Sequence, residues 1–161
     1  WFMEAKACGC PMIVDEEWHR TAFSWEGRTF FQKEVTFFFK NPVGIEERTR
    51  EAAEEIEKRG YAMDDPSIIL VQQGSFKGAV LIGILDPDDA SPDVVTFDAR
   101  PLVSVVRRSK EPKVAPGLKA LKQFVSESHR SIADTYIWYT TCPHCYEIEK
   151  SFTTVLIART A

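Results

Sequence analysis

The spacing of apolar residues divides the first half of the chain into strands around one helix. Residues 33–40 alternate, which places Val35, Phe37 and Phe39 on one face of an extended segment. From residue 45 the apolar spacing becomes that of a helix, and Gly60 marks where this helix ends. Two apolar runs separated by a glycine-containing turn follow. The predicted elements are a strand at 33–40, a helix at 45–59, and strands at 67–76 and 78–85.

The same order of elements returns after residues 86–93, a stretch rich in proline, aspartate and serine that is typical of a linker. Pro116 falls in the first turn of a helical segment that places Leu121 and Val125 inward. The predicted elements are a strand at 94–108 bent near Pro101, a helix at 115–129, and strands at 134–141 and 152–160. The pattern predicts an α+β fold of two strand–helix–strand–strand modules, at 33–86 and 93–161, with an antiparallel sheet and two helices.

The N-terminal segment has a different character, because aromatic residues are dense within it. Two aromatic-rich runs between residues 21 and 34 flank Glu26 and Gly27, a pair suited to a tight turn. We therefore predict an aromatic hairpin here. Residues 1–32 would form an extension that packs on a main domain at 33–161.

Composition and charge limit the classes of partner. The chain has 161 residues, 44% of them hydrophobic and 27% charged, and its net charge is −4. Without a basic block, direct contact with nucleic acid is not expected. No stretch approaches about 18 consecutive apolar residues, so we expect no membrane span. The N-terminal segment lacks the pattern of a signal peptide, which favours a cytoplasmic location.

The doubled order of elements resembles the GyrI-like small-molecule-binding domain, which pairs two strand–helix–strand–strand modules. Two segments carry local likeness: "ARPLVSVVRR" at 99–108 resembles the strand that opens the second module, and "GLKALKQFV" at 117–125 resembles the following helix. The resemblance implies a pocket with aromatic walls and an acidic residue that meets cationic ligands. The closing strand at 152–160 carries no carboxylate, and Glu34 lies on the first strand.

On this basis the leading hypothesis is a soluble module that binds a small hydrophobic or aromatic molecule in the cleft between the modules. Its candidate ligand-binding residues are Trp25, Glu34, Phe37, Phe39, Tyr136 and Trp138. Two alternatives stay open. The same cleft can belong to a hydrolytic enzyme with Glu34 as general base. The chain can also be a zinc-stabilised adaptor whose exposed aromatic residues contact a protein partner. The aromatic residues can equally serve only as core and strand formers.

Four cysteines form two close pairs, Cys8 with Cys10 and Cys142 with Cys145. The second pair is Cys-Pro-His-Cys, which we predict to be a turn between strands, the usual form of half a structural zinc site. The first pair then supplies the other two thiolates, and Gly9 permits the close spacing. The sequence therefore predicts a structural zinc ion bound by all four cysteines.

Two alternative roles for the cysteines stay open. A dithiol redox centre of the thioredoxin type needs much of its fold after the motif, but only residues 146–161 follow Cys145. A reactive dithiol would therefore lie on a different scaffold. The cysteines can also be unrelated thiols, since free cysteine is a common small core residue.

Overall fold

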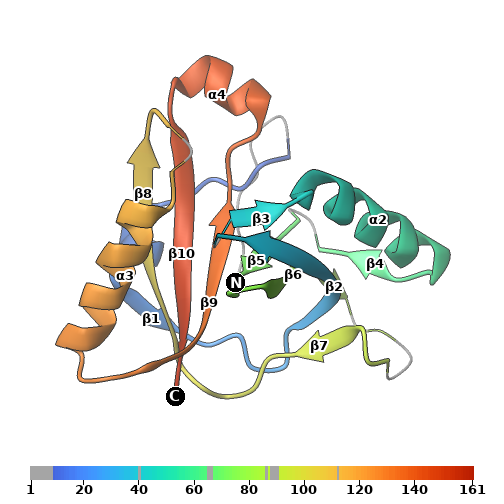
Figure 1. Ribbon diagram of the computed structural model, residues 1–161, viewed down its shortest axis with the longest axis horizontal. Coiled ribbons are helices and arrows are strands. Elements are labelled where there is room, and N and C mark those ends of the chain that lie inside the picture. The colour runs from blue at the N-terminus through green and yellow to red at the C-terminus, as the bar shows by residue number, and fades with distance from the viewer. Residues whose placement is uncertain (1–8, 40, 65–66, 86, 88–90, 112) are drawn as a thin grey trace. The chain divides into compact units, whose positions relative to one another are not determined.

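The computed structural model describes residues 9–161 apart from 40, 65–66, 86, 88–90 and 112 (Figure 1). Contacts between residues group the chain into two units. The middle unit is Trp25–Ala99, and the terminal unit combines Trp1–Ser24 with Arg100–Ala161. In the described part of the chain, no helix is long and apolar enough to cross a membrane.

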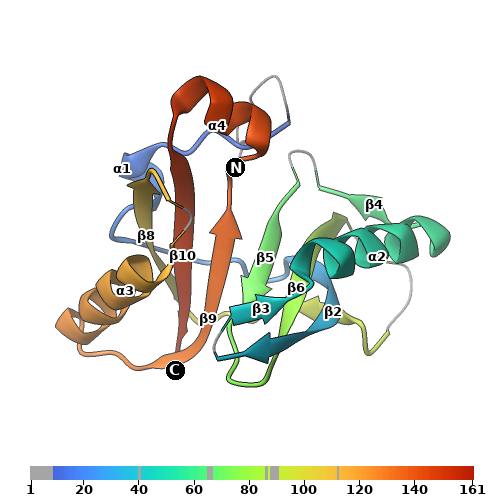
Figure 2. The ribbon, with the colours of Figure 1, turned by 45° about the horizontal axis from the view of Figure 1, so that its top comes forward.

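The middle unit is an antiparallel sheet with one long helix. Its elements are β2 (Thr29–Phe38), β3 (Asn41–Val43), α2 (Ile45–Lys58), β4 (Ala62–Met63), β5 (Ile69–Gln72), β6 (Lys77–Leu85) and β7 (Val94–Thr96). Strands β2 and β6 pair at the centre, β5 and β4 pair with β6, and β3 and β7 pair with β2. Helix α2 packs against β2 and β6 (Figure 2). The order β2, α2, β5, β6 is the predicted strand–helix–strand–strand.

Alternation along β2 separates two layers of side chains. Phe31, Lys33 and Val35 share the face toward α2, where Lys33 reaches Glu51 and Glu55 of the helix. Phe30 lies on the opposite face and packs against Trp25 and Phe97, with ring centroids 5.7 and 5.0 Å away. Phe30 on one face and Phe31 and Val35 on the other are therefore buried.

The terminal unit is a second antiparallel sheet. Its elements are α1 (Asp15–Trp18), β1 (Thr21–Phe23), β8 (Leu102–Ser109), α3 (Ala115–Glu127), β9 (Ile132–Tyr139), α4 (Pro143–Glu149) and β10 (Phe152–Thr160). The strand order is β1, β8, β10, β9. Helix α3 packs against β8 and β10 (Figure 1). Gly117 permits this close approach, because a Cβ there would lie 2.7 Å from Cδ2 of Leu156. Strands β8, β9 and β10 with α3 repeat the strand–helix–strand–strand order.

The α+β class, the antiparallel pairing and the two long helices confirm the prediction from the apolar pattern. Three local predictions are wrong. Strand β1 pairs with Leu102–Ser104 of β8 and forms no hairpin with β2, because β7 already occupies Thr29–Phe31 of β2. Residues 94–108 are therefore two strands, β7 in the middle unit and β8 in the terminal unit. Strand β2 ends at Phe38, and Phe39 turns away with φ 48°.

Candidate functional site

The Cys-Pro-His-Cys segment begins a helix, so the predicted turn between strands is wrong. Pro143 occupies the first turn of α4, where its missing N–H costs no helical hydrogen bond. Cys142 is the N-cap, and its Sγ accepts a hydrogen bond of 3.5 Å from the backbone N–H of Cys145. The helix ends at Glu149, and its C-cap Lys150 adopts φ 55°. Helix α4 thus fixes both thiols of this pair on one turn.

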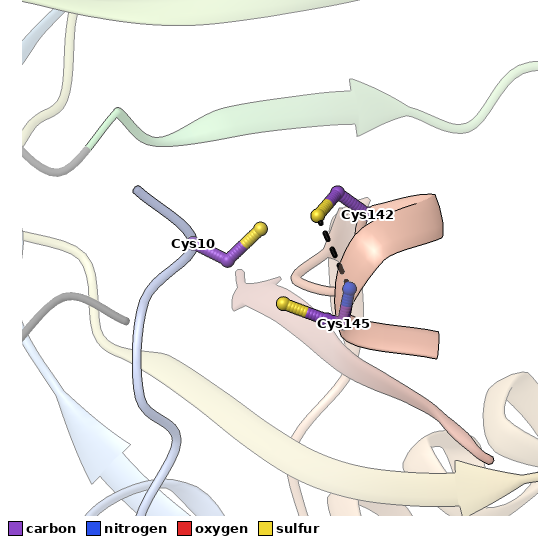
Figure 3. Close-up of side chains that lie close together, drawn as sticks. All are labelled: Cys10, Cys142 and Cys145. Atoms are coloured by element: carbon purple, nitrogen blue, oxygen red, sulfur yellow. Dashed lines mark hydrogen bonds between the residues drawn. The ribbon is translucent and has the colours of Figure 1, made fainter. Parts of the chain in front are cut away.

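Cys10 brings a third thiol to the same place. Figure 3 shows the sulfur atoms of Cys10, Cys142 and Cys145 turned toward one another, and all three lie within 4.8 Å of one another. Zn–S bonds of about 2.3 Å in a tetrahedral site set sulfurs about 3.8 Å apart, so small side-chain adjustments bring three thiolates onto one ion. The three cysteines therefore lie close enough to bind a metal ion.

The surroundings of this cysteine cluster suit a structural site. Cys145 is 3% exposed, Cys10 and Cys142 are half-buried, and His144, which precedes Cys145 in sequence, is exposed. None of the three described cysteines is in a disulfide. Cys8, the fourth predicted ligand, lies outside the described residues.

The candidate ligand-binding residues of the middle unit lie in different environments. Trp25 and Phe37 are buried, and Trp25 belongs to the cluster with Phe30 and Phe97. Phe39 is 81% exposed. Glu34 is exposed and forms an ion pair of 3.5 Å with Lys77. Strand alternation places Glu34 and Phe37 on opposite faces of β2.

Tyr136 and Trp138, the candidates in the terminal unit, lie two residues apart on one face of β9 and are buried. Trp138 meets Trp18 edge to face, with ring centroids 5.2 Å apart. Trp18 in turn meets Phe23 at 5.3 Å. These tryptophans form the aromatic core of the terminal unit.

A hollow of about 600 Å³ lies in the middle unit, beside the part of β2 between β3 and β7. Its lining is mostly polar and charged. The lining residues are Gln32, Lys33, Glu34, Thr36, Arg48, Glu55, Gly78, Ala79 and Asp93. Of the candidate ligand-binding residues, Glu34 contributes to this hollow. It is large enough for a small molecule.

One further carboxylate, Asp64 in the loop after β4, was not among the predicted site residues. Burial raises the pKa of Asp64, and the charge of Arg28 partly opposes this rise. The motif "DDP" around it is typical of an ordinary turn. What distinguishes Asp64 is that its Oδ2 atom is buried beside Gly83 of β6. This burial depends on contacts with residues that are distant in sequence.

The raised pKa of Asp64 predicts a pH-dependent contribution to stability. The folded state holds this proton more tightly than the unfolded state, so the contribution is complete below the unfolded pKa of about 3.9 and is lost as pH rises through the folded pKa. Asp64→Asn removes it. We expect the free energy of unfolding of wild type, relative to Asp64→Asn, to fall as the pH of urea titrations rises above about 4, the usual pKa of an aspartate in an unfolded chain. A difference that does not change with pH would contradict the assignment.

Comparison with known proteins matches this chain to a family and to several solved structures. A family model described as "Bacterial hydrolase" matches residues 3–160. No curated protein matches. The crystal structure of the EcmrR C-terminal domain is similar at TM-score 0.62 and 9% identity, over 88% of this chain and 94% of that chain.

The second similar structure is the cryo-EM structure of an EcmrR–DNA complex, at TM-score 0.65 and 10% identity. The match covers 87% of this chain and 55% of that chain, so this chain spans about half of that protein. At these identities the likeness shows the fold alone, and that fold is GyrI-like in topology.

Proposed function

This chain belongs to the bacterial hydrolase family, and we propose that it is a small-molecule-binding domain that hydrolyses the molecule it binds. The observation that carries the binding part is the GyrI-like topology, matched over 88% of the chain. The hydrolytic part rests on the family, whose match extends over residues 3–160. A fold alone does not fix a reaction, so both parts require direct tests.

For the ligand, we propose a small hydrophobic or aromatic molecule with one polar group that meets Glu34. This carboxylate is accessible and lines the hollow of the middle unit. The buried candidates Trp25, Phe37, Tyr136 and Trp138 contribute only where a ligand displaces existing side-chain packing. Phe39, which is 81% exposed, needs no such displacement.

Thermal shift against a panel of aromatic compounds, with and without a cationic group, tests binding. A ligand at 100 times its Kd stabilises the folded state by about 2.7 kcal/mol, which corresponds to about 5–10 °C in a chain of this size. We expect such a shift for at least one compound, and a smaller one for Glu34→Gln. The absence of a shift for every compound would contradict the binding proposal. A shift in Glu34→Gln equal to that of wild type would exclude Glu34 as a ligand contact.

We further propose that the cysteine cluster holds a structural zinc ion, with Cys10, Cys142 and Cys145 as ligands and Cys8 as the fourth. The convergence of three sulfur atoms supports this set, because thiolates are preferred zinc ligands. Such an ion would tie the N-terminal segment to α4. Bound to four thiolates, zinc has no open position for substrate, so its contribution is to stability.

Elemental analysis of protein purified without chelator tests the metal. We expect about one zinc ion per chain, and markedly less in Cys142→Ser, because loss of one thiolate weakens the site. Zinc far below one ion per chain in wild type, together with a dithiol that oxidises and reduces reversibly, would favour the redox role.

Exposed phenylalanine side chains support a second candidate function, that of a zinc-stabilised adaptor that contacts a protein partner. Phe38 is 66% exposed, and Phe39 and Phe76 are each 81% exposed. Phe76 lies in the turn before β6, and its carbonyl accepts a hydrogen bond from the N–H of Phe37 at the end of β2. Exposed aromatic side chains grouped on one part of a unit are typical of protein contact surfaces.

A further inference from the structure

The outer edge of β2, on the side away from β6, is open between β7 and β3. Strand β7 pairs with Thr29–Phe31 at one end of β2, and β3 pairs with Thr36–Phe38 at the other end (Figure 1). In the part of the chain that the structure describes, neither strand pairs with residues 33–35. These residues span about 10 Å, at about 3.3 Å per residue. The gap therefore has room for about three extended residues of another molecule.

Glu34 is the residue whose main chain faces this gap. Along an antiparallel strand, successive residues direct their N–H and C=O groups to alternate neighbours. The N–H of Gln32 donates to the Asp93 carbonyl oxygen, beside β7, at 2.8 Å. The pairing of β2 with β6 keeps one register from Thr29 to Thr36, so Glu34 directs its groups to the same side as Gln32. An unpaired strand edge of this kind is a template for an added chain.

The hollow of the middle unit lies at this gap, and its end beside Gln32 carries two carboxylates. Asp93 lies there through its contact with Gln32, and Glu55 Oε2 is 3.5 Å from Lys33 Nζ. Arg59 pairs with Asp93 at 2.8 Å and with Glu55 at 3.0 Å. Each carboxylate has about four acceptor sites, so both retain capacity for a ligand ammonium group.

The opposite end of the hollow, beside Thr36, carries a guanidinium. Val43 of β3 pairs with Thr36, and α2 begins two residues after Val43. The N–H of Arg48 donates to the Gly44 carbonyl oxygen at 3.0 Å, and Arg48 lines the hollow. Arg48 pairs with Glu51 at 2.7 Å on the surface, where such pairs are weak. Its remaining N–H donors suit a carboxylate.

We propose that the hollow binds a tripeptide with free termini, extended along the open edge of β2 and parallel to this strand. Its ammonium group lies beside Asp93 and Glu55, and its carboxylate lies beside Arg48. The order of charges along the hollow sets this direction, because an antiparallel peptide would place its carboxylate beside Asp93. This inference rests on the proposed binding function and names the class of ligand for the same hollow.

A parallel tripeptide forms two main-chain hydrogen bonds with Glu34. The Glu34 N–H donates to the carbonyl oxygen of the first peptide residue, and the Glu34 carbonyl oxygen accepts from the N–H of the third. The N–H of the second peptide residue points away from β2. Its side chain lies on the face of β2 that carries Glu34, beside the paired residue Ala79. An aromatic second residue thus supplies the hydrophobic group of the proposed ligand.

Isothermal titration calorimetry of wild type with Ala-Phe-Ala and two N-methylated forms tests the main-chain contacts. Methylation of the third residue's nitrogen removes the donor to Glu34 and should raise Kd by about tenfold or more. Methylation of the second residue's nitrogen is the matched control, and it should change Kd by less than about threefold because that N–H faces solvent. No binding at millimolar Ala-Phe-Ala, or an equal or larger effect of the control methyl group, would overturn the proposal.

Arg48→Gln tests where the peptide carboxylate lies. We expect it to raise the Kd of Ala-Phe-Ala by about fivefold, and to leave the Kd of the C-terminally amidated peptide unchanged. Arg50→Gln is the matched control, because Arg50 is an exposed arginine of the same helix that does not line the hollow. It should bind both peptides as wild type does. An equal change for both peptides in Arg48→Gln would overturn the proposed direction.

The outcomes also separate this proposal from the function on which it rests. If aromatic compounds raise the melting temperature of wild type and Ala-Phe-Ala does not bind, the tripeptide class is overturned and the binding function stands. If neither binds, both fail. If Ala-Phe-Ala binds with the expected effects of methylation and is recovered intact, the tripeptide class stands and the hydrolytic part fails for this peptide.

Discussion

Replacing Cys145 with serine is expected to lower the melting temperature by about 6–12 °C, which corresponds to about 3 kcal/mol in a chain of this size. Serine removes one of three thiolates that lie within 4.8 Å of one another, and it places a hydroxyl where Cys145 is 3% exposed. Because metal binding to a site absent from the unfolded chain stabilises only the folded state, loss of the ion appears directly as loss of stability. Differential scanning calorimetry with parallel zinc analysis measures both.

Two controls separate loss of metal from loss of packing. His144→Ala changes an exposed neighbour within the same helix and should leave both melting temperature and zinc content unchanged. A strong chelator should lower the melting temperature of wild type toward that of Cys145→Ser and have little further effect on the variant. An unchanged melt in Cys145→Ser, with full zinc content, would remove Cys145 from the site.

Replacing Trp138 with alanine is expected to destabilise the protein by about 3–5 kcal/mol, the usual cost of deleting a fully buried large aromatic side chain. Trp138 is 1% exposed and packs edge to face on Trp18, so alanine leaves a cavity beside that ring. Urea unfolding measures the free energy, and unfolding of Trp18→Ala tests the pair from its other side. A cost below about 1 kcal/mol would contradict a core role for Trp138.

Trp138→Phe distinguishes a core residue from a ligand contact. Phenylalanine retains an aromatic ring and part of the buried area. We therefore expect Trp138→Phe to recover most of the stability that Trp138→Ala loses. If Trp138 also contacts the bound molecule, the phenylalanine variant should melt near wild type and yet show a smaller ligand-induced shift. An unchanged shift would limit Trp138 to packing.

The long elements were predictable because their apolar periods are strong. Helix α2 runs over Ile45–Lys58 and α3 over Ala115–Glu127, as the spacing and end signals indicated. Strand partners were less accessible to prediction. Glu26 and Gly27 form the expected turn, yet β1 pairs with β8, since pairing depends on which strand edge is free and not on local sequence.

Short polar and cysteine-containing segments were the least predictable. Helix α4 has seven residues, too few for an apolar period, and Pro143 is compatible with both a turn and a first helical turn. The approach of Cys10 to Cys142 and Cys145 was nevertheless expected, because two close cysteine pairs predict one site. Asp64 carried no signal in the sequence, since the close approach of its carboxylate to Gly83 joins segments that are distant in sequence.

Mass spectrometry of a library of small esters and amides, incubated with wild-type protein and with buffer alone, tests most directly whether this chain binds and hydrolyses small molecules. We predict that wild type converts at least one compound into its two hydrolysis products, which together gain the mass of one water molecule, and that the same compound stays intact in buffer alone. Intact compounds throughout, in folded protein that contains zinc and gives no ligand-induced shift, would contradict the proposed function.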